Sequence, residues 1–145
     1  MTRILLALAL IPTAALAEWT YDPAPDPSGQ AIGAGTNGQR VIVECSNGGL
    51  PAVLIEGPRP FGGDQEDYVL RIDQRDEELI VADCTGDLCL LMFDSFAQAN
   101  GLLNGLRSGS SLSIGFYRRG DGGTVSLRGS SAAIGRVLAR DCPMG

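Results

Sequence analysis

The sequence contains no histidine and no lysine, so arginine alone carries its positive charge. Without histidine there is no imidazole to act as a base near neutral pH. This excludes Ser-His-Asp catalysis, Cys-His catalysis and hydrolysis at a histidine-ligated zinc ion. Without lysine there is no amine to form a Schiff base with a carbonyl substrate. Carboxylates are therefore the main groups left for acid–base chemistry.

Long apolar runs are also lacking, because the most apolar stretch is N-terminal and too short to span a bilayer. Residues 1–17 are typical of a signal peptide. Arg3 supplies the positive charge, Ile4 to Ile11 an apolar core, and Ala15 to Ala17 a small-residue cleavage site. An uncleaved N-terminal anchor is the alternative. No cysteine follows the cleavage site, which argues against a lipid anchor. We therefore expect a periplasmic or secreted protein with no transmembrane segment in the mature chain.

The mature chain, residues 18–145, is acidic. It has 128 residues, with ten arginines against 17 acidic residues and a net charge of −7. Nucleic acid and anionic membranes are poor partners for such a molecule, because binding them needs a basic face. The length suits a single β-rich domain that buries about two thirds of its unfolded surface. Residues 18–39, rich in proline and glycine, are expected to form an extended lead-in to this domain.

The cysteines form an even set, which in an exported protein is typical of two disulfides: Cys45, Cys84, Cys89 and Cys142. Their spacing allows three pairings. Cys84 and Cys89 enclose a turn-like tetrapeptide between two apolar runs and can face each other across a hairpin neck. We therefore favour Cys84 with Cys89, which leaves Cys45 with Cys142. A structural zinc site is the alternative, but the usual C-x2-C spacing is absent.

Short β-branched or alternating runs follow one another along the chain, most of them separated by glycine, proline and aspartate. Seven strands are predicted, at 40–45, 52–56, 68–73, 78–83, 88–93, 111–117 and 124–128. We expect a mainly β fold. It would be an antiparallel β-sandwich or barrel of about seven short strands with two short helices, braced by two disulfides. Strand 88–93 is apolar on both faces, so it should be central and covered on both sides.

Two helices are predicted from apolar residues at helical spacing. The first covers 95–107, is capped by Asp94 or Ser95, and carries a stripe formed by Phe96, Ala99, Leu103 and Leu106. The second begins after Ser130 or Ser131, either of which can cap it. Its buried face would be formed by Ala133, Ile134, Val137 and Leu138.

Three glycines, Gly33, Gly35 and Gly38, match the dinucleotide-binding pattern G-x-G-x-x-G. That mechanism needs a strand before the glycines and a helix N-terminus after them to hold the pyrophosphate. No convincing strand precedes them, and 40–45 reads as a strand. We interpret the pattern as a glycine-rich turn and expect no cofactor.

Acidic side chains gather in two loops that flank strand 68–73: Asp64, Glu66 and Asp67 in one, and Asp73, Asp76, Glu77 and Glu78 in the other. Such groups could bind calcium or form a glycosidase-like carboxylate pair. The spacing does not match an EF-hand loop. Charged hairpin loops are usually just solvated, and they protect edge strands from aggregation. We therefore assign no catalytic residue and no metal ligand.

Arginines form the other candidate site. Arg118 and Arg119 lie at a predicted hairpin end, and Arg128 lies on the following strand, so the three could line a small basic patch. Guanidinium groups bind the carboxylate of an acidic sugar or a chain terminus in bidentate fashion. The alternative is pairing with the many acidic residues of the surface.

The end of the chain, Ser126 to Cys142, reads S-L-R-G-S-S-A-A-I-G-R-V-L-A-R-D-C. Together with Trp19 and Cys45, it resembles the small exported bacterial proteins of the invasion-associated locus B family. The resemblance implies a secreted or periplasmic, β-rich protein. Some members have a proposed part in host-cell invasion. The family contributes no catalytic residue to carry over.

These observations favour an exported, non-catalytic interaction module of the bacterial envelope, whose partner would be another envelope or extracellular protein. The alternative is a small carbohydrate-binding protein or hydrolase that uses the acidic loops at 64–78. The two can be told apart by geometry. If Asp64, Asp67 and Asp73 converged in a concave pocket, the alternative would gain.

Overall fold

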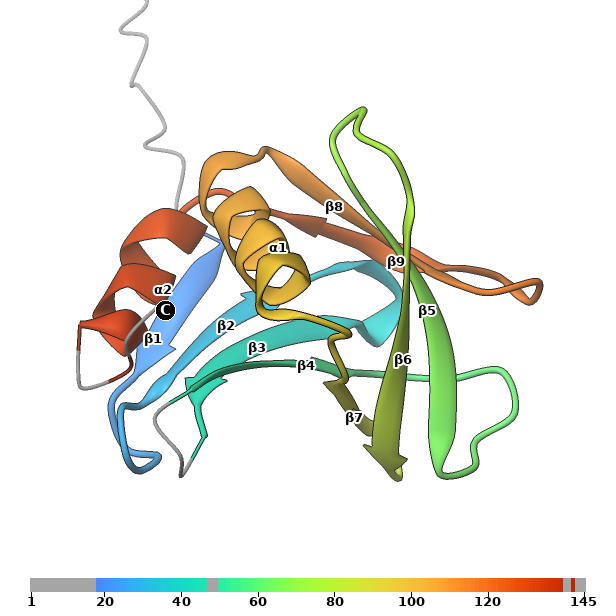
Figure 1. Ribbon diagram of the computed structural model, residues 1–145, viewed down its shortest axis with the longest axis horizontal. Helices are drawn as coiled ribbons and strands as arrows, with labels where there is room; N and C mark the ends of the chain where they lie inside the picture. Colours follow the sequence, from blue (N-terminus) through green and yellow to red (C-terminus); the bar gives the residue numbers. More distant parts are fainter. Residues whose placement is uncertain (1–17, 47–49, 140–141, 143–145) are drawn as a thin grey trace, which may run out of the picture.

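The computed structural model of the protein describes residues 18–46, 50–139 and 142. They form one nine-stranded antiparallel sheet with two α-helices (Figure 1). The N-terminal half contains β1 (Trp19–Asp22), β2 (Gln30–Ala34), the 3-10 helix η1 (Thr36–Gly38), β3 (Arg40–Cys45), β4 (Pro51–Glu56) and β5 (Gln65–Ile72). The C-terminal half contains β6 (Glu78–Thr85), β7 (Leu88–Leu91), α1 (Phe96–Ser108), β8 (Ser111–Phe116), β9 (Gly120–Ser126) and α2 (Ser130–Leu138).

The predicted signal peptide, residues 1–17, lies outside the described residues. Among the residues that are described, no helix is long and apolar enough to cross a membrane.

The order of strands across the sheet is β1-β2-β3-β4-β7-β6-β5-β8-β9, so the meander β5–β6–β7 is inserted in reverse between β4 and β8. Side chains alternate between a buried inner face and an outer face, as a pleated strand requires. In β5, for example, Glu66, Tyr68, Leu70 and Ile72 are buried, while Gln65, Asp67 and Arg71 are exposed. The helices pack against the inner side and contribute Leu103, Leu106, Ile134 and Val137 to the core.

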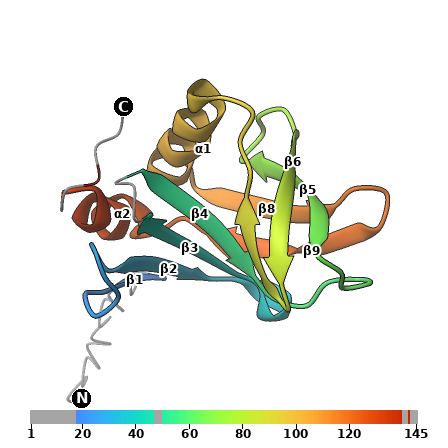
Figure 2. The same ribbon diagram turned by 60° about the horizontal axis from the view of Figure 1, so that its bottom comes forward.

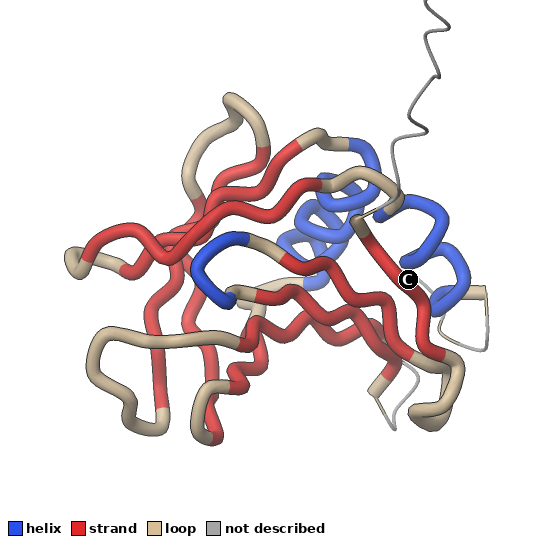
Figure 3. The backbone as a smooth tube through the Cα atoms, turned by 180° about the vertical axis from the view of Figure 1, so that it is seen from behind, coloured by secondary structure: helices blue, strands red, loops and turns tan. Residues whose placement is uncertain are grey.

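The two ends of the sheet curl toward each other without closing. One isolated bridge joins Gly35 to Val125 of β9, and the Thr124 backbone N–H donates to Thr36 Oγ1 at 2.9 Å. Trp19 Nε1 donates to the Ser126 carbonyl at 2.8 Å. Figures 2 and 3 show the curvature from below and from behind. The prediction of an antiparallel, mainly β fold is confirmed. The sandwich or barrel of seven strands is replaced by one open, strongly curved sheet of nine.

The predicted lead-in, residues 18–39, contains two strands that sequence reasoning missed. β1 and β2 pair antiparallel, with Trp19 opposite Gly33. The Trp19 ring lies where a Cβ of Gly33 would be, so the glycine makes room for the aromatic side chain. Tyr21 Oη donates to the Ser28 carbonyl at 2.8 Å and fastens the proline-rich connection between the strands.

The glycines of the G-x-G-x-x-G pattern have structural roles. A strand does precede the turn, contrary to the prediction, because Gly33 belongs to β2. A Cβ at Gly35 would lie 2.5 Å from the Thr124 carbonyl oxygen, and Gly38 has a φ of +75°. The element that follows is strand β3 and not an α-helix, so no helix N-terminus is placed for a pyrophosphate.

Helix α1 begins as predicted. Ser95 Oγ accepts from the Gln98 backbone N–H at 3.1 Å, and Gln98 Oε1 accepts from the Asp94 backbone N–H at 2.8 Å, which forms a reciprocal cap. Leu103 and Leu106 are buried as predicted, and Leu102 is buried with them, whereas Ala99 is only half-buried and Phe96 is 53% exposed.

Helix α2 has no side-chain cap. Its N-cap is Gly129, with a φ of 85°. The hydroxyl of Ser130, predicted as a possible cap, instead donates to the Leu106 carbonyl and ties α2 to α1. The predicted buried face is present, with Ala133, Ile134 and Val137 buried and Leu138 packed at its margin.

Both predicted disulfides are confirmed. Cys84 and Cys89 pair across the β6–β7 hairpin with Cα atoms 4.0 Å apart, and Ala82 faces Leu91 in the same register, as expected. Cys45, at the end of β3, is joined to Cys142 with a Cα separation of 5.7 Å. No described cysteine is free.

Candidate functional site

Strand β7 was expected to be covered on both sides, and this prediction is wrong for its outer side. β7 is central, between β4 and β6, and its inner residues Cys89 and Leu91 are buried. Its outer residues Leu88 and Leu90 are each 38% exposed, and Met92 just beyond is 46% exposed. The helices pack against the inner side only, so the apolar outer side chains face solvent.

These side chains continue a row of apolar residues across the outside of the sheet. The register places Ile32 opposite Ile42, Ile42 opposite Leu54, and Leu54 opposite Leu90. On β6, Val81 is 42% exposed and its carbonyl accepts from the Met92 backbone N–H. We call this surface the outer apolar face; it consists of Ile32, Leu54, Val81, Leu88, Leu90 and Met92. Ile32 and Leu54 are half-buried, and Ile42 between them is only 5% exposed. Exposed apolar side chains gathered in this way are a mark of interaction sites.

Two acidic side chains that have no arginine partner among the described residues border the outer apolar face. Glu44 lies on the same side of β3 as Ile42 and accepts a hydrogen bond from Gln30. Asp83 lies opposite Leu90 and accepts from Gln65. Nearby Arg40 is bound to Glu56 at 2.7 Å, so it adds no net positive charge. Counted over the described residues, the border of the face therefore carries a net negative charge.

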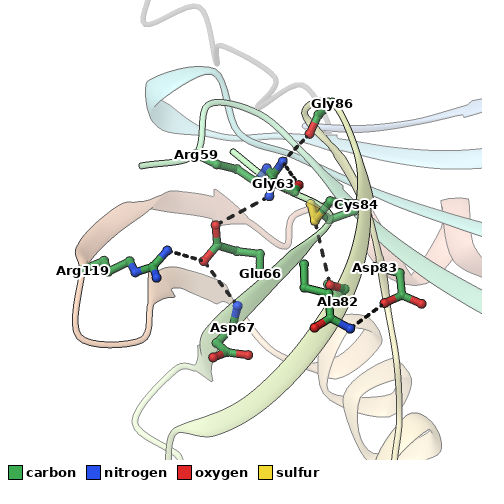
Figure 4. Close-up of a disulfide and its surroundings, with 11 residues drawn as sticks. Arg59, Gly63, Glu66, Asp67, Ala82, Asp83, Cys84, Gly86 and Arg119 are labelled. Carbon is green, nitrogen blue, oxygen red and sulfur yellow. Dashed lines mark hydrogen bonds and ion pairs between the residues drawn. A yellow bond between two sulfur atoms is a disulfide. The ribbon is translucent and has the colours of Figure 1, made fainter. Parts of the chain in front are cut away.

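A second candidate site is a buried ion pair inside one end of the curved sheet. Arg59 Nη1 and Glu66 Oε2 lie 3.7 Å apart, and each side chain is only 2% exposed. Arg59 also donates to the carbonyls of Gly63 and Gly86, at 2.8 and 2.7 Å. Figure 4 shows Arg59 on one side of Glu66 and Arg119 on the other, with the Cys84 disulfide nearby. Arg119 Nη1 is 4.0 Å from Glu66 Oε1.

Several polar atoms of this cluster have no hydrogen-bond partner in the described structure: Arg59 Nε and Nη1, Glu66 Oε2 and Tyr68 Oη. Buried polar atoms normally have partners, so each such group requires an explanation. Burial raises the pKa of Tyr68 to about 12, with the Glu66 carboxylate adding to the rise and Arg59 partly opposing it. Tyr68 therefore stays a neutral hydroxyl at physiological pH.

A pocket of about 260 Å³ lies between β5, with Gln65, Glu66 and Asp67, and the β8–β9 turn, with Tyr117, Arg118 and Arg119. Tyr117 and Arg118 also line a neighbouring groove of about 670 Å³ along β8 and β9. The Arg119 guanidinium stacks 4.7 Å from the ring centre of Phe61, and that of Arg118 5.1 Å from the ring centre of Tyr117. The pocket therefore combines charged groups with one exposed aromatic ring, that of Tyr117.

The predicted site residues are only partly brought together. Arg118 and Arg119 lie side by side in the β8–β9 turn, whereas Arg128 follows the opposite end of β9. Asp73 accepts from the backbone N–H groups of Ser110 and Ser111, beyond the end of β5 that is remote from Asp67. Asp64, Asp67 and Asp73 thus do not converge in one pocket. In the described part of the chain, no three acidic or cysteine side chains are grouped to hold a metal ion.

Sequence reasoning missed the pair formed by Arg59 and Glu66. The prediction began the strand at Tyr68 and assigned Glu66 to a solvated loop. A signal was present, because Glu66 is in phase with the inward positions Tyr68, Leu70 and Ile72 once β5 is extended to Gln65. No comparable signal marks Arg59, which lies on the irregular connection between β4 and β5.

Three features define the fold: the order of the nine strands, the two helices on the inner side, and the disulfide that joins Cys142 to Cys45. The fold resembles that of invasion associated protein B from Bartonella henselae. The TM-score to that crystal structure is 0.61, with 15% sequence identity over 87% of this chain and 95% of the other. At this identity the likeness is one of fold alone.

No family model matches the sequence, and no curated protein matches it.

Proposed function

We propose that this protein is a non-catalytic interaction module of the bacterial envelope, located outside the cytoplasm. It binds a partner protein through the outer apolar face. The observation that carries the proposal is the row of half-exposed apolar side chains across the outside of the sheet, formed by Leu88, Leu90 and Met92 with Val81 beside them.

The core does not account for these residues. The helices pack on the inner side, where alternating residues of the strands are buried, and the outer side chains contribute little to that packing. Exposing Leu90 and Met92 to water is unfavourable by roughly 25 cal/mol for each Å² of apolar surface. A partner that covers the face would recover this free energy.

The charges around the face favour a partner of opposite sign. Within the described part of the chain, Glu44 and Asp83 at its border are bonded to glutamines and to no arginine, while Arg40 is neutralised by Glu56. The partner surface that fits is therefore apolar at its centre with arginine or lysine around it. A second copy of this chain fits less well, because it would bring acidic borders against each other.

Two further observations support a location outside the cytoplasm. Both disulfides are formed, and disulfides persist in oxidising compartments such as the periplasm. The structural neighbour is described as invasion associated, which is compatible with a role in contacts made by the cell envelope.

The proposal is tested by site-specific photo-crosslinking in the envelope of the bacterium that makes the protein. Leu90 is replaced by p-benzoylphenylalanine in the full chain, and Ala132, an exposed residue of helix α2 on the inner side of the sheet, is replaced in the same way as the matched control. We expect position 90, and not position 132, to give one discrete adduct with a different protein. Adding Val81→Asp should abolish that adduct, because it places a charge within the face.

Three results would contradict the proposal. The first is the absence of any adduct at position 90, and the second is an equal yield at both positions. The third is an adduct of the mass of two copies of this chain. The wild-type protein should also run as a monomer in size-exclusion chromatography with light scattering. A stable dimer that Val81→Asp dissociates would assign the face to self-association.

A further inference from the structure

An apolar groove of about 380 Å³ lies where the chain passes from β7 into helix α1, beside Leu50 and Pro51 at the start of β4 (Figure 1). The row of exposed apolar side chains on the outside of β7 ends at Met92, and Met92 also lines the groove. The groove and the outer apolar face are therefore one continuous apolar surface, which turns from the outside of the sheet onto the flank of α1.

The walls of this groove are apolar and partly open to water. Leu50 is 47% exposed, Met92 46% and Phe96 53%, while Leu91 and Leu103 are buried at its base. Phe96 was predicted to be part of the buried stripe of α1, but it forms a wall of the groove instead. A further apolar group placed between these walls would remove all three exposed side chains from water, which is favourable.

The charges near the groove are acidic. Among the described residues, those that line it include no charged side chain. Asp94 lies between the lining residues Phe93 and Ser95, is exposed, and forms no ion pair with an arginine in the described part of the chain. A basic side chain next to the group that enters the groove would complement this carboxylate.

The open shape favours a protein over a small apolar molecule. An acyl chain lying between walls that are about half exposed would itself stay in contact with water. A protein that lies on the outer apolar face covers the groove at the same time, because Met92 belongs to both. A second copy of this chain fits less well, because it would add its own acidic border to that of the first.

We propose that the partner of the outer apolar face anchors itself in this groove with one large apolar side chain, leucine or aromatic, that stands beside an arginine or lysine. This rests on the proposed function and specifies what is recognised in the partner. A single apolar side chain held in a pocket is the usual form of an interface hot spot. The groove volume of about 380 Å³ is at the lower end of ligand pockets, about 300 to 1,000 Å³, which suits one such side chain.

The first test is photo-crosslinking from within the groove, in the envelope of the bacterium that makes the protein. Phe96 is replaced by p-benzoylphenylalanine in the full chain, and Asn104, exposed on α1 and outside the groove lining, is replaced as the control. Position 96 should give an adduct with the same protein as position 90, and position 104 should give none. Peptide mapping should place the attached residue beside an arginine or lysine.

The second test fills the groove. Ala99 lines it and is half-buried, so Ala99→Phe places a ring where the anchor would lie. Ala97 is exposed on the same helix and is not part of the lining, so Ala97→Phe adds the same ring elsewhere. Isothermal titration calorimetry with the protein captured at position 90 should show roughly tenfold weaker binding for Ala99→Phe and no change for Ala97→Phe. Phe96→Ala, which removes an exposed wall and adds no volume, should also weaken binding.

The inference is overturned if both Ala99→Phe and Phe96→Ala bind like the wild type, or if position 96 gives no adduct with the protein captured at position 90. In either case the adduct at position 90 still supports the proposed function. Absence of an adduct at position 90 overturns both proposals. The mass of the adduct at position 96 identifies other occupants, each of which contradicts the inference: a second copy of this chain, an internal crosslink to residues 143–145, or a lipid.

Discussion

Tyr68 is a fully buried tyrosine in a chain that has three tyrosines and no lysine. In most proteins lysine amines dominate the titration between about pH 9 and 12. Because this chain has no lysine, such amines do not mask the ionisation of Tyr68. Burial raises the pKa of Tyr68 to about 12 from 10.0. Because the folded-state pKa is the higher one, stability is full below pH 10 and is lost as the pH rises toward 12.

The expected result is a fall in the free energy of unfolding of about 1 kcal/mol between pH 8 and pH 11 that is specific to Tyr68. Tyr68→Phe should remove this fall, since phenylalanine cannot ionise in the unfolded chain. Tyr117→Phe, a substitution at a 41% exposed ring, should retain it. Urea unfolding followed by the fluorescence of Trp19 measures all three proteins. An equal alkaline loss in wild type and Tyr68→Phe would refute the assignment.

At the scale of single residues, the contacts of a residue could be predicted where the neighbouring sequence gives a strong signal. The four cysteines were paired correctly, because Cys84 and Cys89 flank an evident hairpin turn and only Cys45 and Cys142 remain. The ion pair of Arg59 and Glu66 could not be derived. Its partners lie on different segments, and only the folded sheet brings them together.

The two helices differ in what accepts hydrogen bonds from the free backbone N–H groups of their first turns, and the effect on stability can be measured. Ser95 caps α1 through its hydroxyl, whereas α2 starts at Gly129 and has no side-chain cap. Ser131, predicted as a possible cap of α2, is exposed and sits within the helix.

Ser95→Ala should lower the free energy of unfolding by about 1 kcal/mol, the usual effect of losing an N-cap hydrogen bond. Ser131→Ala should leave it unchanged or raise it slightly, because alanine has the higher helix propensity. Chemical denaturation at neutral pH compares the two variants. If Ser131→Ala proved the more destabilising, the cap of α2 would have been assigned wrongly.

Elements with regular alternation were predicted well, and those with unusual composition were not. The strand at 40–45 agrees with β3 at both ends. β1 and β2 were missed because glycine and proline surround them, and their pairing depends on the Trp19 ring filling the space above Gly33. The apolar outer side of β7 was read as buried, since an apolar side chain in a sequence gives no sign of whether the folded chain covers it or leaves it exposed to solvent.

The two disulfides constrain the whole molecule to different degrees. Cys45 and Cys142 are 97 residues apart in sequence, and Cys84 and Cys89 only 5. In the chain-entropy model the long bridge stabilises the fold by about 5 kcal/mol and the short one by about 2 kcal/mol. All four cysteines are buried, with exposures of 8% or less, so replacing either pair removes a similar amount of packing.

We expect the double variant Cys45→Ala with Cys142→Ala to lose more stability than Cys84→Ala with Cys89→Ala, by roughly 2 to 3 kcal/mol. Guanidinium unfolding of the oxidised proteins measures the difference. Equal losses, or a greater loss for the short bridge, would show that entropy of the unfolded chain does not govern the contribution of these bridges.

The overall curvature of the sheet lay beyond sequence reasoning. Alternation indicated strands and antiparallel hairpins, but the insertion of β5–β6–β7 in reverse order depends on which non-adjacent strands pair. The two ends of the sheet are held near each other by single contacts, such as the bridge from Gly35 to Val125. Such contacts produce no periodic pattern in the sequence.

The first strand and the last are fastened to each other, with Trp19 bonded to Ser126 over a separation of 107 residues and the Glu18 backbone N–H donating to the Arg128 carbonyl. If a polypeptide passes through an export channel with its amino end first, strand β1 cannot make these contacts until almost all of the chain has emerged. If this chain is exported, its folding would be completed only after passage, and Trp19 would stay exposed to water until Ser126 has emerged.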